Sequence, residues 1–337
     1  MLNHKNILIT GGTGSFGKRF INIILNKFSK INKIIIFSRD ELKQYDLKIK
    51  YPQDKYPQLR FYIGDVRDSE RLNRACEGVD YIIHAAALKQ VDTAELNPDE
   101  CIKTNISGAT NVINSALNNN VSKVIALSTD KACAPINLYG ATKLVSDKLF
   151  TAANNIKGEK ACSFSVVRYG NVMGSRGSVI PFFIKNRLNN VLTVTDPKMT
   201  RFNISLDKAV DMVLFSLKSS LGGEIFVPKI PSYRILDVAK AISPKSKIKI
   251  VGIRPGEKLH EEMITQTDSL NTVDIGDQYI ILPSINDRIS KKDYIKFHKG
   301  KEVEVGFEYN SGTNSEWETV ESLRDQIVKH VDPLFKI

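Results

Sequence analysis

Cysteine is scarce in this chain, and long apolar runs are absent. The cysteines are Cys76, Cys101, Cys133 and Cys162, which lie far apart and form no Cys-x-x-Cys pair, and the few histidines are not clustered. This spacing argues against a zinc site and against a disulfide framework, and it predicts free buried thiols. No apolar run approaches the roughly 20 residues of a membrane span, and Met1–Asn6 leads into a short strand rather than a signal sequence. We therefore expect a soluble, cytoplasmic protein that holds no metal ion.

Internal repeats and low-complexity tracts are also missing, and acidic residues are fewer than basic ones. The 48 lysines and arginines exceed the 37 aspartates and glutamates, which gives a formal charge of +11. Because the lysines are scattered instead of gathered in one stripe, we expect a solvated basic surface with some phosphate-binding positions, and no nucleic-acid partner. The 337 residues, 42% of them hydrophobic, suffice for two domains or for one large α/β domain with an appended lobe.

Short β-branched runs alternate with longer segments of helical periodicity. The predicted strands are Asn6–Thr10, Lys33–Phe37, Leu59–Ile63, Tyr81–His84, Lys123–Ser128 and Ser163–Arg168. The predicted helices are Phe16–Phe28, the stretch from Pro98 to Asn118, Asp207–Lys218 and Ile235–Ile242. This alternation predicts an α/β fold with a doubly wound, Rossmann-type parallel sheet. We assign residues 1–172 to a dinucleotide-binding domain and residues 173–337 mainly to a smaller substrate-binding lobe, with some segments returning to the first domain.

The first predicted strand ends in a glycine-rich turn, Thr10-Gly-Gly-Thr-Gly-Ser-Phe-Gly17, that opens a helix. Glycines at 11, 14 and 17 let the backbone turn tightly and approach a pyrophosphate, whose charge then lies at the helix N-terminus. The turn therefore predicts nucleotide binding. The predicted contacts in it are Gly11, Thr13, Gly14, Ser15, Phe16 and Gly17.

The choice between NADP and NAD depends on the end of the second predicted strand. Ser38, Arg39 and Lys43 suit the additional phosphate of NADP, whereas Asp40 or Glu41 would suit the ribose of NAD. We favour NADP, because Ser38 and Arg39 follow the strand directly while the acidic residues begin the next segment and could equally cap a helix. Further cofactor contacts are predicted at Asp65, Val66, Ala85, Ala86, Ala87, Lys89, Asn105 and Val172.

Two acid/base pairs lie close together in the stretch from Ser128 to Lys143. Tyr139 and Lys143 are four residues apart, so they share a face of a helix, where an ammonium beside a phenol favours the phenolate base that hydride transfer requires. Asp130 and Lys131 form a second pair just upstream. A plain alcohol dehydrogenase has no use for that second pair, whereas an enzyme that oxidises one carbon and eliminates water beside it does.

Eight longer motifs carry a family resemblance over nearly the whole chain. They are Arg-Asp-Glu-Leu-Lys-Gln at 39–44, Gly-Asp-Val-Arg-Asp at 64–68, Ser-Thr-Asp-Lys-Ala at 128–132, Tyr-Gly-Ala-Thr-Lys at 139–143, Arg-Tyr-Gly-Asn-Val at 168–172, Gly-Ser-Arg-Gly-Ser-Val at 174–179, Met-Thr-Arg-Phe at 199–202 and Arg-Pro-Gly-Glu-Lys-Leu-His-Glu at 254–261. With these motifs the chain resembles the inverting UDP-N-acetylglucosamine 4,6-dehydratases of the pseudaminic acid pathway. That family belongs to the extended short-chain dehydrogenase/reductase superfamily, and its members form homo-oligomers, often hexamers.

The resemblance implies a role for each residue of the two pairs. Tyr139, assisted by Lys143, would take the proton of the sugar 4-hydroxyl while hydride leaves C4, and Thr129 would hydrogen-bond the 4-oxygen. Lys131 would remove the C5 proton, Asp130 would protonate the departing 6-hydroxyl, and hydride would return to C6. Retaining dehydratases have glutamate where this chain has Lys131, which motivates inversion at C5. A lysine acts as a base only when neutral, so burial or the nearby Lys89 and Lys143 would have to lower its pKa.

The matching motifs also imply the substrate-binding residues. Arginines would hold the diphosphate of the nucleotide-sugar, and Glu257 would bind a ribose hydroxyl. The implied set is Lys89, Thr129, Asn171, Arg176, Val179, Thr195, Arg201, Arg254 and Glu257. Gln90 and Asp92 stand where histidine and proline are more usual in the family, a change that bears on how the sugar is held.

Three other functions compete with this interpretation. A retaining 4,6-dehydratase or a nucleotide-sugar C4 epimerase would use the same scaffold, although an epimerase would not need Asp130 and Lys131. A non-enzymatic NADP-sensing protein commonly loses Tyr or Lys from the Tyr-x-x-x-Lys pair. Both Tyr139 and Lys143 are present here, so we favour an enzyme.

Overall fold

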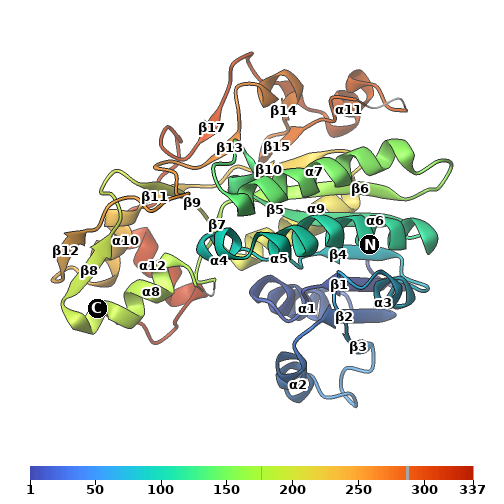
Figure 1. Cartoon of the computed structure of the whole chain (residues 1–337), viewed down its shortest axis with the longest axis horizontal. Coiled ribbons are helices and arrows are strands. Elements are labelled where there is room, and N and C mark those ends of the chain that lie inside the picture. Colours follow the sequence, from blue (N-terminus) through green and yellow to red (C-terminus); the bar gives the residue numbers. More distant parts are fainter. Residues whose placement is uncertain (176, 286–287, 337) are drawn as a thin grey trace.

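The structure is a computed structural model that describes residues 1–175, 177–285 and 288–336. In the described part of the chain, its centre is a ten-stranded sheet with the order β16-β14-β15-β10-β6-β5-β4-β1-β2-β3 (Figure 1). The strands are β1 (Asn6–Thr10), β2 (Lys33–Ser38), β3 (Leu59–Ile63), β4 (Tyr81–His84), β5 (Lys123–Thr129), β6 (Ser163–Tyr169), β10 (Ile225–Pro228), β14 (Thr272–Asp274), β15 (Gln278–Ile281) and β16 (Lys301–Glu302). Strands β1 to β6 and β10 are parallel, whereas β14, β15 and β16 pair antiparallel at one edge.

The six predicted strands are all present, with ends that differ by at most one residue. Strands β2, β5 and β6 are buried because their apolar runs are covered on both faces of the sheet, as a parallel sheet requires, whereas the edge strand β3 is only partly buried. The part of the sheet with the order β3-β2-β1-β4-β5-β6 has the strand order of a doubly wound dinucleotide-binding domain. The predicted Rossmann-type α/β fold is therefore confirmed.

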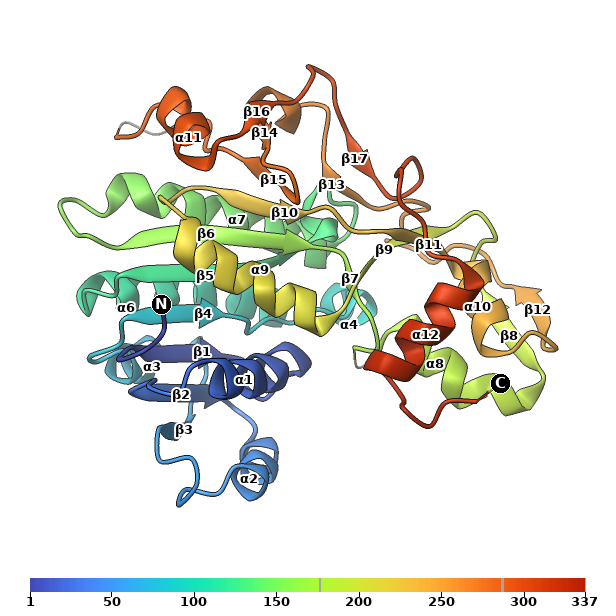
Figure 2. The same cartoon turned by 180° about the vertical axis from the view of Figure 1, so that it is seen from behind.

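Helices cover both faces of this sheet. Helices α3 (Ser69–Ala75), α6 (Gly108–Asn118) and α7 (Leu138–Ile156) lie on the face toward the viewer in Figure 1. Helices α1 (Ser15–Lys27) and α9 (Leu206–Ser219) pack against each other on the opposite face, seen in Figure 2. A further helix, α2 (Glu41–Lys50), follows β2 near the β3 edge. The sheet core therefore includes α9, which comes from the second half of the chain.

The helix predicted from Pro98 to Asn118 is interrupted. The chain forms α4 (Val91–Leu96), α5 (Pro98–Ile102), a π-helical turn at Lys103–Ser107 and then α6. The wider turn contains Asn105, whose amide hydrogen-bonds the backbone of Leu88 in the loop after β4. Such single π turns are frequent at functional sites.

A smaller lobe is built around a second cluster of buried apolar side chains (Figure 2). Its elements are β8 (Val191–Val194), β12 (Lys247–Ile250), α8 (Val179–Asn186), α10 (Ile235–Ile242) and α12 (Val320–His330). Three short strands, β7 (Asn171–Val172), β9 (Thr200–Ile204) and β11 (Ser232–Arg234), form a sheet between this lobe and the main sheet. Strand β13 (Glu262–Ile264) pairs with β17 (Tyr309–Asn310), and α11 spans Lys291–His298. The helices predicted at 207–218 and 235–242 correspond to α9 and α10.

The cysteines are in the state that the sequence predicted. All four cysteines are buried and carry free thiols. Along the described residues we find no helix with the length and hydrophobicity that a membrane crossing demands.

Candidate active site

The glycine-rich turn at the start of α1 packs closely against the loop after β4. Gly11 has a φ of +65°, and a Cβ atom there would lie 2.8 Å from the amide nitrogen of Ala86. Gly14 occupies the N-cap position of α1, so the first amides of this 13-residue helix are not covered by a capping side chain. An exposed helix N-terminus of this kind stabilises a phosphate group. The observed turn therefore fits a dinucleotide.

At the end of β2, Lys43 has a different partner from the one predicted, because it pairs with Asp40. Asp40 is the N-cap of α2 and accepts a hydrogen bond from the Lys43 amide at 3.0 Å, as the capping alternative predicted. The Lys43 ammonium is ion-paired with the same Asp40. Ser38 is buried and accepts a hydrogen bond from Gln44, whereas Arg39 is half exposed with Nη1 3.6 Å from Asp65. Arg39 therefore lies outside the Asp40–Lys43 pair and has Asp65 as its charged neighbour.

The Asn105 side chain hydrogen-bonds the loop after β4. The Asn105 amide oxygen accepts a hydrogen bond from Leu88, and its nitrogen donates to the Leu88 carbonyl and to Thr142, at 2.9 to 3.0 Å. Asn105 thus fixes the loop to α7 with its own polar atoms, in addition to any cofactor contact. The other predicted cofactor residues in this region are buried Val66, half-buried Ala85, Ala86 and Val172, and exposed Ala87 and Lys89.

Helix α7 carries the Tyr139–Lys143 pair in buried positions. Asn137 caps this helix by accepting a hydrogen bond from the Gly140 amide at 2.7 Å. Tyr139 and Lys143 are 8% and 3% exposed, and the Lys143 ammonium donates to the Leu127 carbonyl at 2.7 Å. The structure therefore places both residues on one buried face of a helix, as the spacing predicted.

Gly140 allows α7 to lie directly on the turn that carries the second pair. This turn, η2, is a short 3-10 helix at Asp130–Ala132 that follows β5. A Cβ atom at Gly140 would lie only 2.2 Å from the carbonyl oxygen of Lys131. The contact therefore brings Thr129, Asp130 and Lys131 beside Tyr139 in one site.

The Tyr139 phenolate is not favoured in this structure, contrary to the prediction. Burial raises the pKa of Tyr139 to about 12, although the charge of Lys131 and a hydrogen bond with Thr129 act in the opposite direction. Lys143 points its ammonium at the Leu127 carbonyl, and burial lowers the pKa of Lys143. The cation that acts on the phenol in this arrangement is therefore Lys131.

The lowered pKa that Lys131 would need in order to act as a base is not found in this arrangement. Its Nζ lies 3.0 Å from Asp130 Oδ1 and 3.0 Å from Glu261 Oε1. Burial lowers the pKa of Lys131, but the two carboxylates outweigh burial and raise that pKa above its ordinary value. The neighbouring cation that opposes them is Arg201, rather than Lys89 or Lys143. Lys131 is therefore an ammonium between two carboxylates.

Asp130 has the opposite tendency to an ordinary surface aspartate. It is 1% exposed, and burial raises its pKa, with only partial compensation from Lys131 and Thr129. A carboxyl group of this kind retains a proton more readily than usual, which suits a general acid.

Glu261 is a residue of this cluster that sequence reasoning missed. It ends the 254–261 motif, which was the only available signal, and lies 130 positions after Lys131. Only the tertiary structure joins the segment before β13 to the turn after β5.

Arg201, which was predicted to bind the substrate diphosphate, lies in this cluster beside Glu261. It is 6% exposed, its Nη1 donates to the Thr200 and Leu259 carbonyls, and its Nε lies 3.7 Å from Glu261. The role of holding a diphosphate remains a prediction for this side chain.

The other predicted substrate residues are spread along the lobe side of the site. Buried oxygens of Asn171 and Glu257 have no hydrogen-bond partner among the described residues. Arg254 is exposed, Thr195 donates to the Met199 sulfur at 3.0 Å, and Val179 begins α8. The predicted contact at Arg176 lies outside the described residues.

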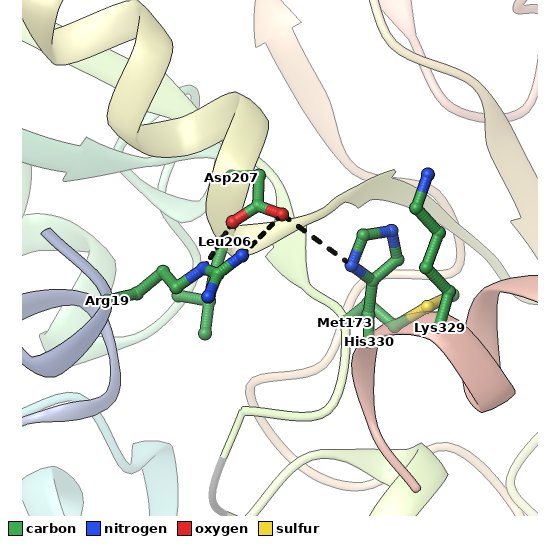
Figure 3. Close-up of a pocket in the computed structure, with 6 residues that line it drawn as sticks. All are labelled: Arg19, Met173, Leu206, Asp207, Lys329 and His330. Atoms are coloured by element: carbon green, nitrogen blue, oxygen red, sulfur yellow. Dashed lines mark hydrogen bonds and ion pairs between the residues drawn. The ribbon is translucent and has the colours of Figure 1, made fainter. Parts of the chain in front are cut away.

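A separate pocket of about 430 Å³ lies between α1, α9 and α12 (Figure 3). Asp207 holds the Arg19 guanidinium with both carboxylate oxygens, and His330 Nδ1 lies 4.0 Å from the same carboxylate. None of the predicted catalytic residues lines this pocket. Its Arg19–Asp207 pair joins α1 to α9. No group of metal-ligating side chains that could hold an ion occurs among the described residues.

The strand order, the glycine turn and the Tyr139–Lys143 pair define a Rossmann-type enzyme of the short-chain dehydrogenase/reductase class. The family model described as "Polysaccharide biosynthesis protein" matches residues 7–283. An inverting UDP-N-acetylglucosamine 4,6-dehydratase from Campylobacter jejuni is 53% identical over 98% of this chain and 99% of that protein. The chain thus belongs to the polysaccharide biosynthesis protein family, and within it to the inverting UDP-N-acetylglucosamine 4,6-dehydratases, which are nucleotide-sugar 4,6-dehydratases.

Two other similarities set the breadth of this family. A UDP-glucose 4-epimerase from Rickettsia akari is 46% identical over 83% of this chain and 84% of that protein. The crystal structure of Pen from Bacillus thuringiensis has a TM-score of 0.87 and 37% identity, covering 98% of each chain. Both reactions named among these relatives act at C4 of a nucleotide-sugar.

Proposed function

We propose that this protein is an NADP-dependent dehydratase that converts UDP-N-acetylglucosamine to UDP-2-acetamido-2,6-dideoxy-L-arabino-hexos-4-ulose, with inversion at C5. The observation that carries the proposal is the contact of the Asp130–Lys131 pair with Tyr139 in one buried site. Two acid/base pairs side by side match a reaction with separate proton transfers at O4, C5 and O6.

The first proton transfer belongs to Tyr139. The Tyr139 phenolate, formed once the phenol has lost its proton, accepts the proton of the 4-hydroxyl, and Thr129, beside it, hydrogen-bonds the same oxygen. Because burial holds the pKa of Tyr139 near 12, a positive charge close to the phenol is needed in the reaction. Lys131 supplies such a charge. Lys143, on the next turn of the helix, donates a hydrogen bond to the Leu127 carbonyl.

The second stage needs a base at C5 and an acid at O6, and one proton shift produces both. The pair begins as the Lys131 ammonium and the Asp130 carboxylate, 3.0 Å apart. Transfer of one proton between them leaves a neutral amine and a carboxylic acid. The amine then takes the C5 proton, and Asp130 gives its proton to the departing 6-hydroxyl. Water leaves, and the pair returns to its starting protonation state. When hydride arrives at C6, a solvent-derived proton adds to C5 on the opposite face, which completes the product and inverts that carbon.

We propose NADP, rather than NAD, as the cofactor. A bound nicotinamide would supply the acceptor and donor of the hydride that moves from C4 to C6. The glycine turn from Gly11 to Gly17 would hold its pyrophosphate, and Ser38 with Arg39 would bind the 2′-phosphate. The capping role of Asp40 supports this choice, because that carboxylate is already used by the α2 amides and by Lys43.

The substrate site is proposed on the lobe side of the same centre. Asn171 and Glu257 would bind hydroxyl groups, since each has a buried oxygen without a partner. Arg176, Arg201 and Arg254 would bind the diphosphate.

We place the protein in the cytoplasm and in the pseudaminic acid pathway. We also propose that it forms a homo-oligomer, and light scattering of the purified protein measures that state directly.

The deciding experiment incubates the purified protein with UDP-N-acetylglucosamine in D2O and follows the sugar by proton NMR. We expect a 6-deoxy-4-keto sugar with deuterium at C5 and L-arabino couplings. Retained D-xylo couplings would keep the dehydratase but refute inversion. Unchanged substrate would refute the acceptor.

A C4 epimerase is the second candidate, because the Rickettsia akari relative carries that name at 46% identity. An epimerase needs no acid/base pair at C5 and C6. Lys131→Ala protein that retains full activity and yields only the C4 epimer would establish this alternative.

A further inference from the structure

The Glu261 carboxylate is built into the reaction centre from three parts of the chain. It is 2% exposed, with Oε1 3.0 Å from Lys131 Nζ and 3.7 Å from Arg201 Nε. Its backbone amide donates to Ser311 Oγ at 2.9 Å, and its carbonyl accepts from the Ser311 amide at 2.8 Å. These contacts fix the carboxylate beside the ammonium.

Two oxygens of the cluster have no hydrogen-bond partner among the described residues. They are Asp130 Oδ2 and Glu261 Oε2, and both are buried. A buried carboxylate oxygen without a partner is unfavourable. A purely structural ion pair would satisfy these oxygens with protein donors, so the arrangement fits a site that a polar ligand completes.

The charges of the cluster balance only when Glu261 is counted. Asp130 and Glu261 contribute two negative charges, and Lys131 and Arg201 contribute two positive charges. Without the Glu261 carboxylate the cluster would have one excess positive charge, and the proton shared by Asp130 and Lys131 would leave more readily.

We propose that Glu261 is a positioning residue for the elimination: its carboxylate holds the Lys131 side chain against Asp130 and keeps the proton that this pair shares within the site. The inference deepens the proposed dehydratase function and rests on it. Dehydration needs one proton on the pair, because Asp130 must deliver it to the leaving hydroxyl. Exchange of hydrogen at C5 needs only the neutral amine of Lys131.

The test compares dehydration and C5 exchange in Glu261→Gln protein as a function of pH. Absorbance of reduced nicotinamide in single turnovers separates C4 oxidation from the later steps. Proton NMR in D2O follows C5 exchange of the 4-keto-6-deoxy product, which needs no hydride transfer. The charged and titratable groups of the cluster are Asp130, Glu261, Arg201, Tyr139 and Tyr233 around Lys131, and Lys258 beside Glu261.

We expect the alkaline loss of dehydration to begin about one to three pH units lower in the variant than in the wild-type protein, as removal of a close opposite charge predicts. C5 exchange should persist at alkaline pH. An unchanged alkaline limb would overturn the proposal and leave Glu261 a structural role. Loss of C5 exchange at every pH would also overturn it, because Glu261 would then itself be the base.

Two further proteins make the result decisive. Glu224→Gln is the matched control, because Glu224 is a fully buried carboxylate that is paired with His298 Nε2 at 3.2 Å, away from the site. It should lower thermal stability and keep the wild-type pH limb. If Glu261→Gln does not fold, Glu261→Asp should show a smaller shift of the same sign, and no shift would refute the proposal. Wild-type protein that forms no 4-keto-6-deoxy sugar would refute the proposed function instead.

Discussion

Tyr139 and Lys131 are both buried, and burial acts on their protons in opposite directions. Loss of hydration raises the pKa of the Tyr139 phenol to about 12, because the phenolate is the form that loses water. The same loss lowers the pKa of Lys131, but the carboxylates of Asp130 and Glu261 more than compensate. Both groups are therefore protonated at neutral pH. Each must give up a proton before it acts as a base.

Arg39 offers a prediction at the same scale, for the choice of cofactor. Arg39→Ala should weaken NADP binding by about tenfold or more, because a charged hydrogen bond to phosphate contributes about 1.5–3 kcal/mol. NAD binding should change little, since NAD has no 2′-phosphate. Fluorescence titration of both cofactors measures the two affinities, with Lys30→Ala as an exposed control. Equal loss for NAD and NADP would contradict the assignment of Arg39 to the 2′-phosphate.

Between elements, the active site depends on how closely α7 approaches the turn η2. A Cβ atom at Gly140 would lie 2.2 Å from the Lys131 carbonyl oxygen, so no side chain fits between the helix and the turn. Asn137 sets the start of α7, and β5 sets the start of η2. The spacing of the two acid/base pairs is therefore a property of element packing.

Gly140→Ala should separate these two elements. The added methyl group would lie 2.2 Å from a backbone oxygen, and we expect a loss of about 1–3 kcal/mol in the free energy of unfolding. Dehydration should fall more than cofactor affinity, because the glycine turn of α1 is not displaced. Urea unfolding and NMR turnover assays test this expectation. Ser146→Ala on the same helix is the control, and wild-type turnover in Gly140→Ala would show that the close approach is dispensable.

A second contact between elements concerns stability. Glu224, just before β10, accepts hydrogen bonds from the Leu221 and Gly222 amides and from Ser165, and pairs with His298 of α11. Burial raises the pKa of Glu224, but these partners outweigh burial and lower that pKa below its ordinary value of 4.5. The stabilisation is therefore present at neutral pH and is lost as pH falls through the lowered pKa.

Glu224→Ala should destabilise the protein by about 3 kcal/mol at pH 7, as removal of one partner of a buried pair does. The difference from wild-type should shrink in acid, because the wild-type carboxylate loses its advantage there. Urea unfolding at neutral and acidic pH measures both values, with Glu77→Ala as an exposed control. A difference that grows in acid would contradict the sign of this linkage.

Over the whole molecule, the chain crosses repeatedly between the sheet and the lobe. Strands β10, β14, β15 and β16 return to the main sheet, and α9 packs on α1. Asp207 at the start of α9 binds Arg19 of α1 and lies near His330 of α12, so three distant segments meet at one carboxylate (Figure 3). The hydrogen bond from Arg19 lowers the pKa of Asp207 below its ordinary value of 3.8.

Asp207→Asn should lower stability by about 0.5–1 kcal/mol at neutral pH, since the pair is partly exposed. This contribution should disappear as pH falls through the lowered pKa of Asp207, because protonation removes the same charge from the wild-type. Thermal unfolding at several pH values follows the effect, and Asp211→Asn on the same helix is the control. An equal effect of both substitutions would show that the junction is no stronger than an ordinary surface pair.

The sequence by itself determined the six parallel strands from β1 to β6, and it named most of the candidate site residues. Runs such as Lys33–Phe37 are apolar enough to be buried on both faces, and the spacing of Tyr139 and Lys143 is local. The glycine turn and the order Thr129-Asp130-Lys131 are likewise contiguous, and local physical chemistry applies to contiguous residues directly.

Only the tertiary structure decided the protonation of the site. Glu261 and Arg201 are distant from Lys131 in the chain. Glu261 reaches the Lys131 ammonium and Arg201 lies beside Glu261, because β13 packs against η2. The same applies to the π turn at Asn105, whose side chain hydrogen-bonds the distant Leu88, and to the return of β14 to β16 to the sheet. A pKa depends on the charges and the burial around a group, and these are set by packing between segments that no local pattern connects.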